Sequence, residues 1–219
     1  MRANTIRILL ADSQQMFLDG LVAMFSKDPN WQVVATSTDS SKAFFQIVEQ
    51  VPDIIIMDVE LAGRGAFTVA EEVASRFPAT KIVFLTGFES DVLVEQALRL
   101  DVAGYLLKSD SFTQLVANLR AILQGEKRYS ERVFDRLEFD STQQEFQVKS
   151  TTYLSGLTSR QLEVLRHLVR GESVKEVAKA MMLSERAIES HKYRIMQKLG
   201  IHDRVELTRF AIREGLTIP

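Results

Sequence analysis

The chain contains no cysteine, which excludes disulfide bonds, thiol catalysis and zinc sites built on thiolates. Histidine is scarce too, and its three copies (His167, His191 and His202) all lie in the C-terminal third. A site built on histidine is therefore excluded from the first part of the chain. No apolar run approaches the ~20 residues that span a bilayer, and the N-terminal run ends too early for a signal peptide. We therefore expect a cytoplasmic protein with no membrane contact.

Charge is distributed unevenly along the 219 residues, of which 46% are hydrophobic and 26% charged. This composition is typical of a globular protein with one large or two small domains. Residues 157–219 carry 12 Lys and Arg against 8 Asp and Glu, a net charge of +4, whereas the preceding residues carry 15 against 21, a net charge of −6. A basic module joined to an acidic one is the charge pattern of a nucleic-acid-binding domain beside a domain that avoids nucleic acid.

Apolar segments and helical spacing alternate through the first 125 residues or so. Strands are predicted at Ile6–Ala11, Trp31–Ala35, Asp53–Met57, Lys81–Leu85 and Ala103–Leu107. Helical stripes lie between and after them, at about 16–25, 43–51, 69–77, 91–100 and 111–124. Five strands that alternate with five helices predict an α/β fold with a doubly wound, five-stranded parallel sheet of the flavodoxin-like kind.

Polar residues stand where four of these strands end: Asp12, Asp58, Thr86 and Lys108. The carboxyl ends of parallel strands meet at one edge of the sheet, which is where ligands bind in such folds. We therefore expect these four side chains to converge on a functional site. A plain ion pair between Asp58 and Lys108 that only closes the sheet is the structural alternative.

Residues 173–200 predict two helices joined by a tight turn. Ser184 is placed to cap the second helix and Gly200 to end it. One stripe of that helix would pack (Ile188, His191, Ile195 and Leu199), and the opposite side would be exposed (Arg186, Glu189, Ser190, Tyr193 and Gln197). An ordinary helical hairpin would show the same spacing. The positive charge of this region favours a helix-turn-helix, in which the second helix enters the major groove of DNA.

Motifs in both halves resemble those of a known family. ILLADS, IIIMDVELAG, FLTG and GYLLKS resemble a response-regulator receiver domain. LTSRQLEVLRHLVRGES, the helix-turn-helix and KLGIHDRVELTRFAIREGL resemble the LuxR-type DNA-binding domain. The whole chain is similar to two-component regulators of the NarL/FixJ class. The resemblance implies a receiver at 1–125 and a small all-α DNA-binding domain at 157–219 with its motif at 173–192. Between them, the Ser, Thr and Gln content and weak periodicity of residues 126–156 predict a linker, with some helix at 131–137.

The resemblance also implies roles for residues of the receiver. Asp58 would accept a phosphoryl group from a sensor histidine kinase. Mg²⁺ would be held by Asp12, Asp58 and the backbone carbonyl of Glu60. Lys108 and Thr86 would contact the phosphoryl group, and Tyr105 would follow Thr86 as a switch.

One position departs from the receiver pattern, because Ser13 stands where receivers carry a second acidic residue. A hydroxyl is a poorer Mg²⁺ ligand than a carboxylate, so weaker metal binding is expected. This leaves open a receiver that works without phosphorylation. A second alternative is an aspartyl-phosphate phosphatase, since Asp58 and Glu60 are spaced as in such enzymes, but this leaves residues 157–219 unexplained.

For the C-terminal domain we expect base contacts from Glu189, Ser190 and Tyr193. Phosphate contacts are expected from Arg186, Lys192, Arg194, Lys198 and, on the first helix of the motif, Lys175. Each of these basic residues could instead be part of a solvated helix face. Together the motifs predict a transcription regulator rather than an enzyme, binding double-stranded DNA as a homodimer.

Overall fold

The computed structural model describes residues 5–141, 145–149, 153–214 and 216. Its contacts divide the chain into two compact units. The sheet unit comprises Met1–Phe88 and Leu100–Phe134, and the helical unit comprises Glu89–Arg99 and Asp135–Pro219. Across the described residues, no helix is long and apolar enough to cross a membrane.

The sheet unit is built on a parallel sheet in the order β2-β1-β3-β4-β5-β6. Its strands are β1 (Ile6–Ala11), β2 (Trp31–Ser37), β3 (Ile54–Met57), β4 (Lys81–Thr86), β5 (Gly104–Leu107) and β6 (Arg128–Tyr129). The first five confirm the predicted strands. Strand β6 is an addition, since it lies in the segment that the sequence assigns to a linker.

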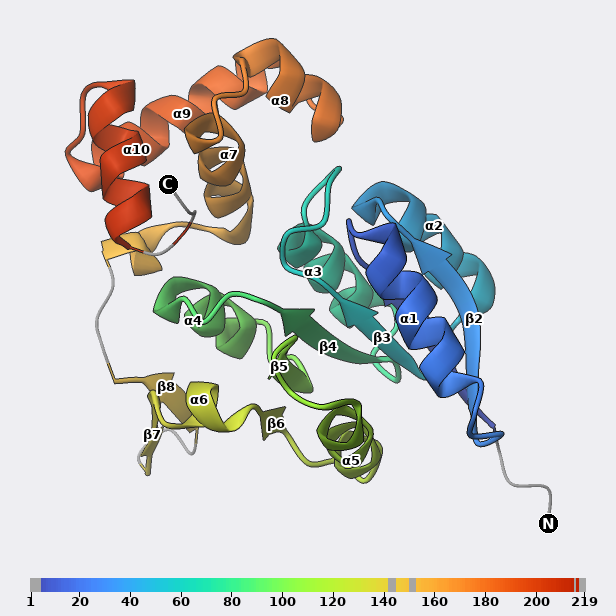
Figure 1. Ribbon diagram of the computed structural model, residues 1–219. Coiled ribbons are helices and arrows are strands. Elements are labelled where there is room, and N and C mark those ends of the chain that lie inside the picture. Colours follow the sequence, from blue (N-terminus) through green and yellow to red (C-terminus); the bar gives the residue numbers. More distant parts are fainter. Residues whose placement is uncertain (1–4, 142–144, 150–152, 215, 217–219) are drawn as a thin grey trace. The chain divides into compact units, whose positions relative to one another are not determined.

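Helices cover both faces of this sheet, as Figure 1 shows. They are α1 (Gln15–Phe25), α2 (Ser40–Gln50), α3 (Ala66–Arg76) and α5 (Phe112–Leu123), and the short α6 (Glu131–Phe134) follows β6. Helices α1 and α5 share one core with the sheet, in which Leu18, Ile56 and Leu119 are at most 2% exposed. This burial explains why the central strands read as continuous apolar runs.

The segment 126–156 contains more regular structure than the polar sequence predicts. Besides β6 and α6, the strands β7 (Leu137–Asp140) and β8 (Glu145–Val148) form an antiparallel hairpin. Residues 142–144 and 150–152 of the predicted linker lie outside the described residues. The expectation of a largely irregular segment is therefore wrong for its described part, whereas the short helix predicted near Glu131 is present.

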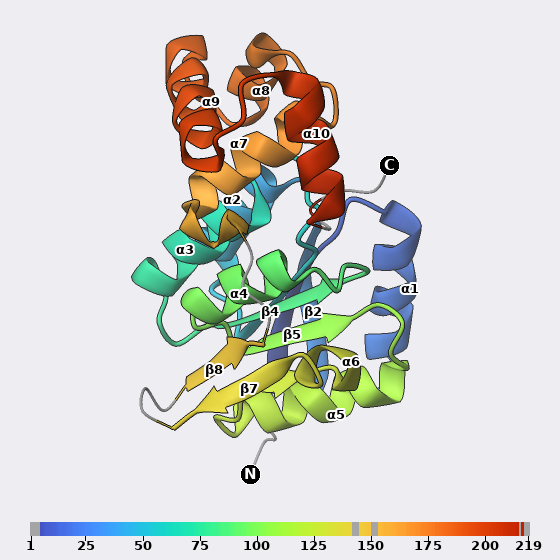
Figure 2. The ribbon, with the colours of Figure 1, turned by 90° about the vertical axis from the view of Figure 1, so that its left-hand side faces the viewer.

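The helical unit contains α7 (Ser159–Val169), α8 (Val174–Ala180), α9 (Glu185–Leu199) and α10 (Arg204–Arg213), drawn in orange to red in Figure 2, after a 3-10 turn η1 (Tyr153–Gly156). Capping boxes start α7 at Thr158 and α8 at Ser173, where each hydroxyl accepts a backbone N–H from the third helical residue.

The helical unit also contains α4 (Asp91–Arg99), although the alternation of elements predicts this helix as part of the receiver. The side chain of Gln96, only 2% exposed, donates Nε2 to the carbonyl of Leu157 at 3.3 Å. The guanidinium of Arg136 donates to the Asp91 carboxylate at 2.7 Å.

Candidate phosphoryl site and nucleic-acid interface

Two carboxylates and one ammonium group meet at the carboxyl edge of the sheet. Asp12 follows β1, Asp58 follows β3 and Lys108 follows β5. The Lys108 Nζ lies 2.6 Å from Asp12 Oδ2 and 2.7 Å from Asp58 Oδ2. The other oxygen of each carboxylate accepts a backbone N–H, from Gln14 at 2.9 Å and from Glu60 at 3.1 Å. The sequence therefore placed these three residues correctly at one point.

These charged groups are buried, which sets their electrostatics. Asp12 and Asp58 are 3% and 4% exposed. Burial raises the pKa of the Asp12 carboxyl, against the lowering effect of its hydrogen bonds to Lys108 and Gln14. Burial also acts to lower the pKa of Lys108, but hydrogen bonds to Asp12 and Asp58 outweigh it, so that this pKa is raised. The lysine therefore stays charged. Counted with two ionised carboxylates, the three groups carry a formal net charge of −1.

Thr86 and Tyr105 are both fully buried and both bond to Phe88, in the loop after β4. The Thr86 Oγ1 accepts the Phe88 N–H at 3.3 Å, and the Tyr105 hydroxyl donates to the Phe88 carbonyl at 2.8 Å. One peptide segment therefore links the two predicted switch residues. The backbone N–H of Lys108 donates to the carbonyl of Thr86 at 2.8 Å, which ties β4 to the lysine as well.

Hard oxygen donors at this edge fit a cation such as Mg²⁺. Two carboxylate oxygens already converge on the single point that the Lys108 ammonium takes, and Glu60, two residues after Asp58, donates its backbone N–H to the other Asp58 oxygen. Among the described residues, no group of three or more acidic or histidine side chains could hold a metal. Because Mg²⁺ keeps several waters and needs only one or two carboxylates, the donor set fits the ion.

Sequence reasoning missed two residues around Lys108. Its ammonium lies 4.8 Å from the centre of the Phe17 ring, a cation–π contact with α1. The hydroxyl of Ser130 accepts the Leu107 N–H at 2.8 Å and donates to the Asp110 carboxylate, which fixes the loop after β5. Helical spacing marks Phe17 only as a core residue, and no local signal marks Ser130.

Helix α9 has the two faces that its sequence predicts. Ile188 and Ile195 are fully buried, whereas Tyr193 is 63% exposed. The exposed side also presents Arg186, Glu189, Ser190, Arg194 and Gln197. Ser184 caps the helix by accepting the Ala187 N–H at 3.2 Å, and Gly200 ends it with a φ of 65°.

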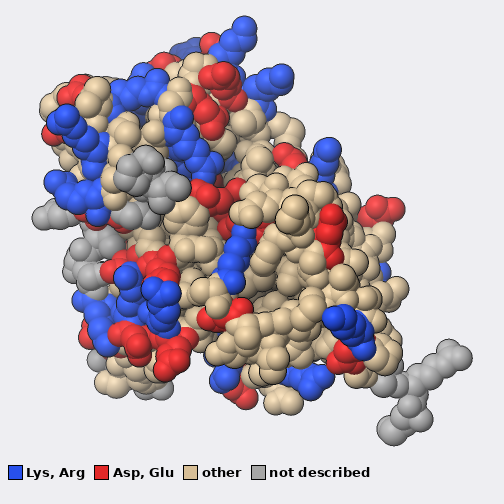
Figure 3. All heavy atoms as spheres, in the orientation of Figure 1, with Lys and Arg blue, Asp and Glu red and all other residues tan. Residues whose placement is uncertain are grey.

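The basic side chains assigned to DNA differ in their contacts within the protein. The Lys198 ammonium donates to the Gly156 carbonyl at 2.8 Å and to Gln161 Oε1 at 2.9 Å. Lys192 lies 3.4 Å from the Glu189 carboxylate. Arg186, Arg194 and Lys175 are exposed. Figure 3 shows Lys and Arg side chains in blue, with acidic ones between them, over the C-terminal helices.

His191 lies at the margin of the packed side of α9 and is half-buried. Burial lowers its pKa, and the positive charges of Arg160 and Arg194 lower it further. The imidazole is therefore neutral at neutral pH and adds no charge to the exposed face.

Two family models match the chain. Residues 8–120 match the response regulator receiver domain, and residues 155–211 match the bacterial regulatory proteins of the luxR family. Over 214 residues the chain is 29% identical to the oxygen regulatory protein NreC of Staphylococcus aureus, covering 96% of this chain and 99% of NreC.

Solved structures of the RcsB response regulator of Salmonella typhimurium share the fold. One has a TM-score of 0.73 at 23% identity and covers 97% of this chain and 99% of RcsB. Another, RcsB bound to the promoter P1flhDC with the phosphomimetic BeF3−, has a TM-score of 0.69 at 25% identity and covers 94% of this chain and 98% of RcsB. From its matches to both domain families, the chain belongs to the response regulators that join a receiver domain to a LuxR-family DNA-binding domain.

Proposed function

We propose that Asp58 is the phosphoacceptor through which a sensor histidine kinase controls this transcription regulator. The observation that carries the proposal is the position of Lys108, whose ammonium bridges Asp58 and Asp12. Phosphoryl transfer to Asp58 needs a positioned carboxylate oxygen and a fixed cation for the charge of the phosphoryl oxygens. The Asp58 carboxylate attacks phosphorus, and the bond from phosphorus to the kinase histidine breaks.

Mg²⁺ is the proposed cofactor, with Asp12, Asp58 and the Glu60 carbonyl as its ligands. When bound, the ion offsets negative charge on the transferring group. Asp12 and Asp58 lie close enough to share one cation, as their common contact with Lys108 indicates. Ser13 in place of an acid reduces the charge of the site, so we expect weaker Mg²⁺ binding than in a receiver with two adjacent acids.

The switch we propose runs through Phe88. A phosphoryl group on Asp58 would offer Thr86 a new acceptor for its hydroxyl proton and draw it toward the β3 edge. Because Thr86 Oγ1 and the Tyr105 hydroxyl are both bonded to Phe88, a shift of Thr86 disturbs the Tyr105 hydrogen bond too. Such a change would alter the loop that leads into α4.

Helix α9 is the proposed reading helix of the DNA-binding domain. We assign base contacts to Glu189, Ser190 and Tyr193, which share its exposed side. Phosphate contacts are assigned to Arg186, Lys192, Arg194, Lys198 and Lys175. RcsB, at 25% identity, is seen bound to promoter DNA, which supports this assignment. Lys198 is given the smallest share, because its ammonium is already bonded within the protein.

The proposed active form is a homodimer that binds two half-sites of duplex DNA in the cytoplasm, and its role is regulatory rather than enzymatic. The comparisons give no support to the phosphatase alternative, or to a receiver that works without phosphorylation. A phosphatase would also leave the exposed polar side of α9 without a role.

Genome-wide DNA capture with the wild-type chain and Asp58→Asn tests control by phosphorylation. After incubation with a small phosphoryl donor and Mg²⁺, we expect the wild-type chain to capture specific sites and Asp58→Asn to capture them far more weakly. Glu71→Gln, an exposed carboxylate on α3, is the matched control and should behave like wild type. Equal capture by all three proteins would remove Asp58 from the mechanism, and failure of all three to bind DNA at low salt would remove the role of α9.

A further inference from the structure

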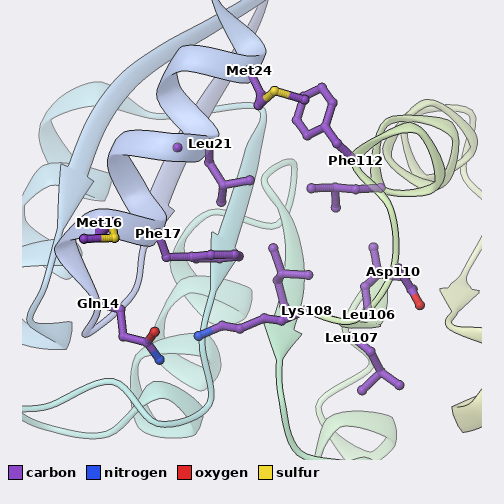
Figure 4. Close-up of a pocket in the computed structure, with 13 residues that line it drawn as sticks. Gln14, Met16, Phe17, Leu21, Met24, Leu106, Leu107, Lys108, Asp110 and Phe112 are labelled. Atoms are coloured by element: carbon purple, nitrogen blue, oxygen red, sulfur yellow. The ribbon is translucent and has the colours of Figure 1, made fainter.

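A hollow of about 470 Å³ lies between α1 and α5, next to Lys108. Figure 4 shows its walls, with Phe17, Leu21 and Met24 on α1 facing Leu106 and Phe112. Its size falls within the range of small-molecule sites, which are mostly apolar with a few polar groups. Methionine side chains at such a site adapt to the shape of a ligand.

Gly20 provides an independent observation, because it stands in the middle of α1 and lines the hollow. Glycine is among the least favourable residues inside a helix. A Cβ built at Gly20 would meet no atom within 4 Å, so packing does not require a glycine there. The lack of a side chain at Gly20 therefore widens the hollow and lowers the helix propensity of α1.

The charges around the hollow select against ions. Lys108 reaches into it, but two of its three N–H donors go to Asp12 and Asp58, which leaves a formal net charge of −1. With neither Mg²⁺ nor a phosphoryl group at Asp58, that charge disfavours a free carboxylate or phosphate in the hollow, and the ammonium takes the point on the two carboxylates that a cation would need. The carboxyl of Asp110 points away from α1 and is bonded to Ser130. The third N–H of Lys108, whose ammonium lies 4.8 Å from the centre of the Phe17 ring, is the one available to a neutral oxygen.

We propose that this hollow binds a small, uncharged, mainly aromatic molecule with one carbonyl or hydroxyl oxygen. The rings lie between Phe17, Leu21 and Phe112, and the oxygen accepts the third N–H of Lys108. The inference does not depend on phosphorylation of Asp58. It gives the receiver a second input, because the ligand would hold the lysine that pairs with Asp58.

Energy transfer from tryptophan to the neutral naphthalene ketone PRODAN tests the proposal on the full chain. Trp31 is the only tryptophan, and it lines the adjoining hollow together with Met24 and Phe112, two residues that also line the proposed site. We expect saturable transfer with the wild-type chain. Gly20→Leu should weaken binding by at least about tenfold by filling the space, while Gly20→Ala should change it by less than about threefold.

Two controls separate this site from other occupants. Phe45→Ser removes a side chain that is 68% exposed on α2 and should leave PRODAN binding unchanged. The anionic naphthalene dye ANS should bind at least about tenfold more weakly than PRODAN if charge selects the ligand. Equal binding to Gly20→Leu and wild type, or ANS binding as tight as PRODAN, would overturn the proposal. So would a dimer in sedimentation that PRODAN dissociates and Gly20→Leu abolishes, because a second copy would then fill the hollow.

Discussion

The edge of the sheet and the exposed side of α9 use charged residues in opposite ways. Asp12 and Asp58 are at most 4% exposed and share one ammonium, whereas Tyr193 and its neighbours on α9 stand in solvent. A buried charge costs several kcal/mol unless it is paired, while an exposed one costs little. The first site therefore couples function to the stability of the sheet unit, and the second can change without affecting the stability of its helix.

Lys108→Met is expected to have the largest effect, because it leaves two buried carboxylates without their common partner. We expect the free energy of unfolding of the sheet unit to fall by about 3 kcal/mol. Arg194→Met on α9 is the matched change and should shift the stability of the helical unit by less than about 0.5 kcal/mol. Urea denaturation followed by Trp31 fluorescence and by circular dichroism measures both; similar losses would remove the contrast.

Glu189→Ala tests the exposed side of α9 by its effect on binding alone. Loss of a base contact should reduce discrimination between the specific site and a site changed at one base pair by about 1–3 kcal/mol. The thermal midpoint should stay that of wild type, since Glu189 is exposed. Glu145→Ala, which removes an exposed carboxylate from β8, is the matched control, and fluorescence anisotropy with labelled duplexes gives both affinities. Unchanged discrimination would place Glu189 away from the bases.

Asp12→Asn should stabilise the sheet unit at neutral pH by about 1 kcal/mol, as often happens when a functional charge is removed. Because burial raises the folded pKa of Asp12 above its ordinary value of 3.8, the folded state binds the proton more tightly than the unfolded chain. The stability that protonation contributes is lost as the pH rises from the unfolded pKa through the folded pKa. The advantage of Asp12→Asn should therefore grow over that interval and then level off. Urea denaturation at several pH values measures it, and a constant difference would contradict the raised pKa.

Two basic residues of α9, Arg194 and Lys198, are expected to contribute unequally to DNA binding, and this is the smallest of the effects. Arg194→Met should reduce the slope of log affinity against log salt by about 0.9, the loss of one phosphate contact. Lys198→Met should change that slope by less, because its ammonium donates to Gly156 and Gln161. Anisotropy titrations over a range of salt concentrations distinguish the two. Equal changes would mean that DNA draws Lys198 away from its partners in the protein.

Much of the fold and of the site could be predicted from local patterns. Fully buried strands such as Ile54–Met57 read as unbroken apolar runs, and a polar residue marks where each ends. Asp12, Asp58 and Lys108 were predictable as neighbours because parallel strands place their carboxyl ends together. The two sides of α9 followed from helical periodicity alone. The contacts of each residue with DNA, metal and phosphoryl group stay predictions.

Features that depend on distant backbone partners could not be predicted. Strand β6 has two residues, and its position is set by pairing with Gly104 and Tyr105 rather than by its own side chains. The hairpin of β7 and β8 carries Glu138, Glu145 and Gln147 at exposed positions, which lowers its apolar signal. The Ser130 contacts with Leu107 and Asp110 join residues 20 or more positions apart, and no spacing rule connects them.

Strand β6 has a practical consequence for anyone who dissects this protein. Ser130 donates its N–H to Tyr105, and Arg128 donates to Ala103, so the outer side of β5 is satisfied by the segment that follows α5. A fragment that ends at residue 125 would leave the carbonyls of Ala103 and Tyr105 without these hydrogen bonds, and an unpaired strand edge can pair with other chains. Aggregation or dimerisation of such a fragment would then be caused by the chosen boundary. A boundary after Phe134 keeps the sheet closed on that side.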